Sequence, residues 1–127
     1  MKKFVLDASA LIASIYQEKG HDIVDEYLSS AVISVVNLTE VVAYLIKQEN
    51  NIQEIQGLIK DLNLEIIDFD EVQAFKCAEL IKKTSKFGLS LGDRACISLG
   101  ISKKLPILTA DKIWKNLDLE AKIILIR

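Results

Sequence analysis

The sequence contains one histidine, one proline and two cysteines among its 127 residues. The single histidine, His21, excludes catalysis by a pair of histidines, and we interpret it as a residue of a loop or of a helix start. The two cysteines, Cys77 and Cys96, do not form a CxxC pair, so buried thiols are a better interpretation than a zinc site. Unpaired thiols fit a reducing, cytosolic setting.

Long apolar runs are also missing, because no run approaches the roughly 18 residues that a membrane helix needs. The first apolar run, Phe4 to Leu6, ends at a charged residue and does not resemble a signal peptide. The G-x-S-x-G motif of serine hydrolases and the G-x-x-x-x-G-K-[ST] phosphate loop are both absent. Trp114 and the three tyrosines form no array on which nucleic-acid bases would stack. We therefore expect one cytoplasmic globular domain, residues 1–127, outside these enzyme classes.

Net charge is only −2, but the charges are unevenly distributed along the chain. Residues 1–71 carry 5 Lys and Arg against 13 Asp and Glu, a net of −8, whereas residues 72–127 carry 11 against 5, a net of +6. Solvated helix faces explain this pattern, and so do phosphate contacts beside an acidic site. The same two interpretations apply to the basic cluster Lys82, Lys83 and Lys86.

Short apolar runs alternate with longer segments of helical period. The runs predict strands at residues 4–6, 32–35, 64–67, 107–109 and 122–126, and the periodic segments predict helices at 9–17, 23–29, 37–48, 52–62, 71–86, 91–102 and 112–116. Strands that are short and apolar on both sides indicate a parallel sheet covered on both faces. The predicted fold is a three-layer α/β/α sandwich with a central, mostly parallel β-sheet.

Two aspartates directly follow predicted strands. Asp7 lies past the first strand and Asp111 past the fourth, and ligands of open parallel sheets bind at the carboxyl ends of strands. Each aspartate alone is better explained as the cap of the next helix, because caps are common. Two further acids have capping-box spacing: Glu40 follows Asn37 by three residues, and Asp93 follows Ser90 by three. Four acids at one edge of a sheet are less probable as four independent caps.

Four motifs that contain these acids resemble those of PIN-domain ribonucleases, and most closely those of VapC toxins from toxin–antitoxin pairs. They are VLDASALIA, SVVNLTEVV, LSLGDRAC and LPILTAD, and they span residues 5–111 in the family's order. The resemblance implies a catalytic quartet of Asp7, Glu40, Asp93 and Asp111, with hydroxyl residues at Ser9 and Thr109 beside the acids.

The resemblance also implies a reaction: metal-dependent endoribonuclease activity in which water attacks RNA and leaves a 5′-phosphate and a 3′-hydroxyl. A few carboxylates without His or Cys suit Mg²⁺, with Mn²⁺ able to substitute. Asp7, Asp93 and Asp111 are the predicted metal ligands, whereas Glu40 either binds metal or orients the attacking water. Arg94 either contacts RNA phosphates or pairs with a nearby acid.

The resemblance and one predicted helix both indicate that the chain has protein partners. The predicted helix 37–48 is apolar most of the way round, with Tyr44 and Ile46 outside its main stripe, so it needs burial on more than one side. The family supplies two candidates for covering it, a second copy of the chain and a small antitoxin. Contact with neighbouring helices of the same domain is the alternative.

The RNA substrate that the resemblance implies is structured tRNA. The alternative functions are a nuclease of RNA processing and an inactive RNA- or protein-binding module.

Overall fold

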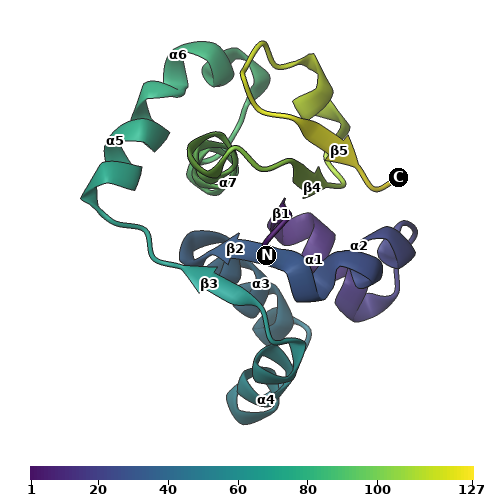
Figure 1. The fold of residues 1–127 in the computed structure, drawn as a ribbon. Coiled ribbons are helices and arrows are strands. Elements are labelled where there is room, and N and C mark those ends of the chain that lie inside the picture. The colour runs from purple at the N-terminus through teal and green to yellow at the C-terminus, as the bar shows by residue number, and fades with distance from the viewer.

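The computed structural model describes residues 1–127, and its centre is a wholly parallel five-stranded sheet. The strands are β1 (Phe4–Leu6), β2 (Ala31–Ser34), β3 (Glu65–Ile67), β4 (Ile107–Thr109) and β5 (Ile123–Leu125). Their order across the sheet is β3-β2-β1-β4-β5 (Figure 1). The chain therefore moves outward from β1 in one direction through β2 and β3, and in the other through β4 and β5. This order makes the gap between β1 and β4 the topological switch point.

Helices cover both faces of the sheet. They are α1 (Ala8–Tyr16), α2 (His21–Tyr27), α3 (Val35–Lys47), α4 (Ile52–Leu62), α5 (Glu71–Glu79), α6 (Ile81–Thr84) and α7 (Leu91–Lys103), with 3-10 turns η1 (Leu28–Ser30), η2 (Ser85–Phe87) and η3 (Lys112–Asn116). Alternate strand residues point to opposite faces. Leu6, Ile33 and Leu108 pack in the cluster formed with α1 to α4. Their neighbours Val5, Val32 and Ile107 pack in the cluster formed with α7 and Trp114. The predicted three-layer arrangement is confirmed.

The prediction of one continuous helix over residues 71–86 is wrong. Residues 71–86 form not one helix but α5, α6 and η2, with Leu80 at the first break. Thr84 is fully buried and its hydroxyl donates to the Leu80 carbonyl at 2.8 Å. The break lets both Leu80 and Phe87 pack against the cluster around Trp114, which a straight helix would carry away from the core.

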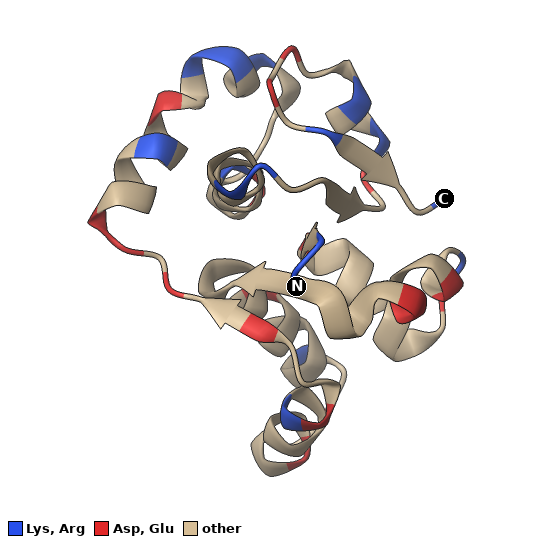
Figure 2. Ribbon diagram, viewed as in Figure 1, with Lys and Arg blue, Asp and Glu red and all other residues tan.

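The uneven charge of the sequence becomes a spatial division in the fold. Lysines gather on α6 and the turn η3, whereas acidic residues mark α2 and the stretch around β3 (Figure 2). No helix of the chain combines the length and the apolar character required to span a bilayer.

Candidate active site

The switch point of the sheet carries two of the four predicted acids. Asp7 directly follows β1, and Asp111 follows the neighbouring strand β4 after one residue. A network of hydroxyls joins these two strand ends. Ser9 accepts the Ala110 amide at 3.0 Å, and Thr109 accepts the Asp111 amide at 3.1 Å. The predicted hydroxyl residues thus lie beside the acids.

Asp7 lies at the centre of this network. Its side chain is 5% exposed, and its Oδ2 accepts hydrogen bonds from Ser9 Oγ at 2.7 Å and Thr109 Oγ1 at 2.8 Å. Its other oxygen, Oδ1, accepts none. Burial raises the pKa of Asp7 from 3.8 to about 6; the two hydroxyl hydrogen bonds oppose this rise, and the charges of Asp93 and Glu40 add to it. Asp7 is therefore ionised at neutral pH at a cost in stability.

Asp93 lies in the first turn of α7 and forms the predicted capping box with Ser90. The Ser90 amide donates to Asp93 Oδ2 at 2.9 Å, and the Asp93 amide donates to Ser90 Oγ at 3.1 Å. The capping interpretation is thus confirmed for this residue, but it uses only one carboxylate oxygen. Capping and a role in the site are compatible, because Oδ1 is left without a protein donor.

The predicted capping box of Asn37 and Glu40 is wrong. Helix α3 begins two residues earlier than expected, and Ser34 caps it by accepting the Val36 amide at 3.2 Å. Asn37 therefore lies inside the first turn, fully buried. Its Nδ2 donates to Glu40 Oε1 at 2.8 Å and to the Gly92 carbonyl at 2.9 Å. Asn37 thus holds the Glu40 carboxylate and joins α3 to α7.

Gly92 makes room for that carboxylate. A Cβ added at Gly92 would lie 2.6 Å from Glu40 Cδ and 2.7 Å from Oε1, closer than Cβ atoms approach other atoms. Desolvation raises the pKa of Glu40, the Asn37 hydrogen bond opposes this, and the charge of Asp93 adds to it. Asn37 and Gly92 are the residues that the motif analysis missed. The sequence contains one indication of their importance, because each lies in a motif that also contains one of the four acids.

The buried thiol of Cys96 lies within the electrostatic influence of three of the acids. Burial raises the pKa of Cys96 well above its ordinary value, and the charges of Asp7, Asp93 and Glu40 raise it further. Both cysteines are buried and unpaired, as predicted. Asp111 is not among the charges that act on Asp7, Glu40 or Cys96. Its Oδ1 accepts the Ile113 amide at 3.0 Å and caps η3, so Asp111 joins the site through Thr109.

The donor chemistry of the four carboxylates fits a hard divalent cation. Each has one oxygen in a protein hydrogen bond and a second oxygen without one. None forms an ion pair, since the ion pairs of the molecule are His21–Asp25 and Arg127–Glu18. Unpaired carboxylate oxygens are the ligands that Mg²⁺ prefers. The side chains do not form a group close enough to hold an ion as they stand.

Arg94 does not form the ion pair with an acid that was one of its two predicted roles, whereas its contact with RNA phosphates stays a prediction. Its guanidinium donates to the Leu89 carbonyl at 2.9 Å, and it forms no ion pair with Asp93 or another acid. Arg94 lies beside Cys77. Burial raises the pKa of Cys77, and the positive charge of Arg94 opposes this rise. Arg94 therefore faces α5 and ties the start of α7 to the loop before it.

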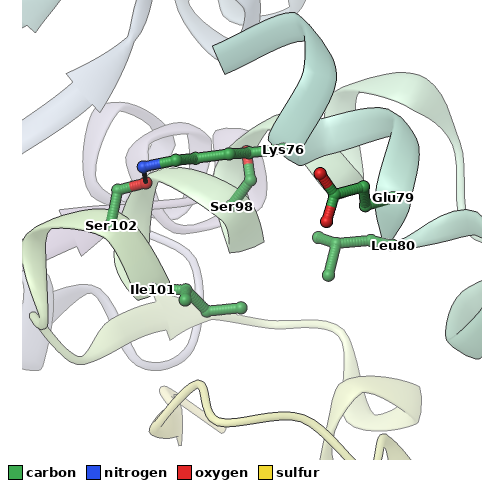
Figure 3. A pocket seen from close by; sticks show the side chains of 6 residues that line it. All are labelled: Lys76, Glu79, Leu80, Ser98, Ile101 and Ser102. Atoms are coloured by element: carbon green, nitrogen blue, oxygen red, sulfur yellow. Dashed lines mark hydrogen bonds between the residues drawn. The ribbon is translucent and has the colours of Figure 1, made fainter. Parts of the chain in front are cut away.

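A separate pocket of about 390 Å³ lies between α5 and α7 and contains none of the four acids (Figure 3). Its lining is Lys76, Glu79, Leu80, Ser98, Ile101 and Ser102, and Lys76 Nζ donates to Ser102 Oγ at 3.2 Å. The cluster of acids at the switch point, rather than this pocket, is the candidate active site.

Comparison with known proteins agrees with this fold. The family model described as PIN domain matches residues 4–120. No curated protein sequence matches significantly. Among solved structures, VapBC from Salmonella typhimurium bound to DNA has a chain 19% identical, with a TM-score of 0.77 and 100% of both chains covered. VapBC2 from Rickettsia felis bound to a promoter DNA fragment is 22% identical, with a TM-score of 0.75 and 96% and 97% covered. VapBC-5 from Mycobacterium tuberculosis is 22% identical, with a TM-score of 0.61 and 100% and 99% covered.

Proposed function

From the premise that this chain belongs to the PIN domain family, we propose that it is a metal-dependent endoribonuclease that hydrolyses RNA phosphodiester bonds. One observation carries the proposal. Four carboxylates surround the switch point of the sheet, each with an oxygen free of protein hydrogen bonds and none neutralised by a basic side chain. Such a group favours a divalent cation and, through it, a phosphate.

Asp7, Asp93 and Asp111 would hold Mg²⁺, or Mn²⁺ in its place. The cation, when bound, supplies neutralisation of phosphate charge and lowers the pKa of water. The chain's own residues do the positioning. Ser9 and Thr109 fix Asp7 Oδ2, so that Oδ1 alone is presented to the site. These hydroxyls therefore support the acid, and their place at the site also allows contact with the substrate.

Glu40 is the residue suited to the attacking water. Asn37 holds its Oε1, and Oε2 remains available to accept a proton from water. In the proposed hydrolysis, the water oxygen forms a bond to phosphorus and the bond to the 3′-oxygen breaks. The leaving oxygen takes up a proton, giving a 5′-phosphate and a 3′-hydroxyl.

We propose further that the chain is the toxin of a cytoplasmic toxin–antitoxin pair. The likeness to chains of VapBC complexes supports this role through the shared fold. An apolar groove of about 370 Å³ between α3 and α4 also supports it, because an amphipathic segment of a partner would fit there. The groove is lined by Leu38, Val42, Ile52, Ile55, Gln56, Ile59 and Lys60. A basic side chain of the antitoxin would find four unpaired carboxylates to bind.

The experiment that tests nuclease function replaces single acids. Asp7→Asn, Asp93→Asn and Asp111→Asn should each abolish cleavage of an RNA substrate in Mg²⁺, because each loses a charged ligand while keeping a side-chain oxygen. Asp61→Asn, at an exposed position of α4, is the matched control and should cleave like the unaltered protein. Cleavage at the unaltered rate by two of the three site variants, with circular dichroism showing all variants folded and EDTA abolishing activity, would refute the assignment.

A further inference from the structure

We propose that a lysine-lined pocket between α6–η2 and η3 binds the phosphates of an RNA strand beside the acidic site. The inference rests on the proposed nuclease function and names the surface on which the substrate lies. The pocket has a volume of about 220 Å³ and is lined by Lys82, Lys83, Lys86, Phe87, Asn116 and Asp118. We call it the lysine pocket.

The two walls of the lysine pocket are direct continuations of segments that carry site acids. The η2 turn ends at Phe87, shortly before the capping box that holds Asp93 at the start of α7. The η3 turn begins directly after Asp111, which caps it. Phe87 and Leu117 both pack against the cluster around Trp114, which holds the two walls together. Each wall of the pocket is therefore linked along the chain to a site acid, one to Asp93 and the other to Asp111.

Charge makes this pocket attractive to an anion. Three ammonium groups face one carboxylate, Asp118, and none of the three lysines is in an ion pair. The break of the predicted helix at Leu80 puts these lysines there, with Thr84 buried between them as an anchor. Lysines grouped in this way can neutralise successive phosphates and release counterions.

The lysine pocket fits phosphate better than a base. Lys86 Nζ lies 5.2 Å from the centre of the Phe87 ring, so the lysine covers a ring face on which a base would otherwise stack. The volume is below the roughly 300–1,000 Å³ typical of small-molecule sites. Asn116 adds an amide that can donate to a phosphate oxygen. We therefore expect binding that depends on the strand backbone and little on sequence.

A second group of lysines provides a matched control. Lys104 and Lys122 line a pocket of about 360 Å³ with Glu120 and Pro106, and Lys103 is exposed nearby at the end of α7. These residues precede β4 and β5, so they lie at the amino edge of the sheet, away from the acids. Both groups have three lysines with one acid close by. Only position relative to the acidic site distinguishes them.

The test measures binding of a single-stranded RNA oligonucleotide in EDTA at several salt concentrations. In the triple variant Lys82→Gln, Lys83→Gln, Lys86→Gln, the slope of log K against log salt should fall in magnitude by about 2, since each phosphate contact on a single strand contributes about 0.7. The triple variant Lys103→Gln, Lys104→Gln, Lys122→Gln should keep the original slope. Asp118→Asn should bind more tightly, because it removes the one negative charge of the pocket.

An unchanged slope in the first triple variant, or an equal fall in both triple variants, would overturn the lysine pocket as a substrate site. Melting curves on each variant separate loss of binding from loss of folding. Cleavage in Mg²⁺ is measured separately. An unaltered protein that binds RNA with the expected slopes but does not cleave it would refute the nuclease proposal and support the pocket. Cleavage of RNA together with unchanged salt slopes in all variants would support the nuclease proposal and refute the lysine pocket.

Discussion

At the scale of single residues, Asp7 is the position where function and stability conflict. Both hydroxyl donors, Ser9 and Thr109, bind the same oxygen of its carboxylate, although the residue is 5% exposed and faces two other acids. A structural role alone would be served equally well by a neutral side chain with the same acceptor. We therefore attribute the buried charge to the cation that Asp7 is proposed to bind.

Asp7→Asn should stabilise the metal-free protein in a pH-dependent way. Because the native pKa is raised from 3.8 to about 6, the native state holds its proton more tightly than the unfolded chain does. Below about pH 4 the carboxyl is protonated in both states and carries no ionisation cost. The cost grows through pH 4 to 6 and is complete above that, reaching about 3 kcal/mol. Urea unfolding in EDTA at pH 4, 5 and 7 should show the variant gaining stability over the unaltered protein as pH rises.

Metal binding sharpens this test. Mg²⁺ should raise the melting temperature of the unaltered protein at pH 7 and do so less for Asp7→Asn, since ligand binding to the native state stabilises it. A difference in stability that does not vary with pH would contradict the burial of an ionised Asp7.

At the scale of elements, the contact of α3 with α7 determines where Glu40 lies. Asn37 donates from α3 to the Gly92 carbonyl in α7 and to Glu40 within α3, and its own Oδ1 is buried without a donor. The orientation of the amide is unambiguous, because reversing it would place an oxygen against two acceptors. We infer that Asn37 and Gly92 are positioning residues for Glu40.

Asn37→Leu should lower RNA cleavage by about 10- to 100-fold, the range typical of residues that orient a ligand of a metal site. The same substitution in a Glu40→Gln background should cost little more, because its effect runs through Glu40. Kinetic measurement of all three variants completes the cycle. Equal losses of activity in both backgrounds would indicate a general packing defect instead of positioning.

Gly92→Ala should also reduce cleavage, because the new methyl group displaces the Glu40 carboxylate. Gly57→Ala is the control on α4, where an added Cβ meets nothing within 4 Å. Since alanine is the better helix former by about 1 kcal/mol, Gly57→Ala should stabilise the protein and leave its activity unaltered. Full activity in Gly92→Ala would show that Glu40 has room to move without consequence.

At the scale of the whole molecule, large apolar residues remain exposed on several helices, among them α3 and α5. On α3, Tyr44 is 36% exposed, and its ring packs edge-on against that of Tyr16 of α1 with 5.8 Å between the ring centres. Ile46 on the same helix is 50% exposed. Contact within the domain thus accounts for part of the Tyr44 surface but not for Ile46. On α5, Val72 and Phe75 are also exposed. We propose that the α3 surface belongs to the interface with a second copy or with the antitoxin.

Ile46→Glu should convert a homodimer to a monomer or weaken antitoxin binding, because a charge would enter an apolar contact. Light scattering of the isolated chain and calorimetry with the antitoxin measure the two effects. Val72→Glu is the matched control, since it places the same charge on an exposed apolar residue of α5. A monomeric chain at high micromolar concentration whose antitoxin affinity is unchanged by Ile46→Glu would contradict the interface. Disruption by Val72→Glu alone would move the interface to α5.

The sequence alone determined the order of strands and helices, the parallel sheet and the capping of α7 by Ser90 and Asp93. Local causes decide these features: apolar periodicity, short β-branched runs and side chains that bind their own helix. Only the tertiary structure showed that residues 71–86 break into three pieces, because burial of Leu80, Thr84 and Phe87 outweighs helix continuity.

The same division applies to the candidate site. Asp7 and Asp111 could be placed at strand ends from the sequence, because a strand end is a local feature. The roles of Asn37 and Gly92 could not, since they depend on a hydrogen bond and a close approach between residues 55 positions apart. The predicted pairing of Arg94 with an acid is wrong for a related reason: its hydrogen-bond partner is a backbone carbonyl, which no pattern of side chains indicates. Contacts between elements that are distant in the chain are decided by packing, and packing exists only in the folded molecule.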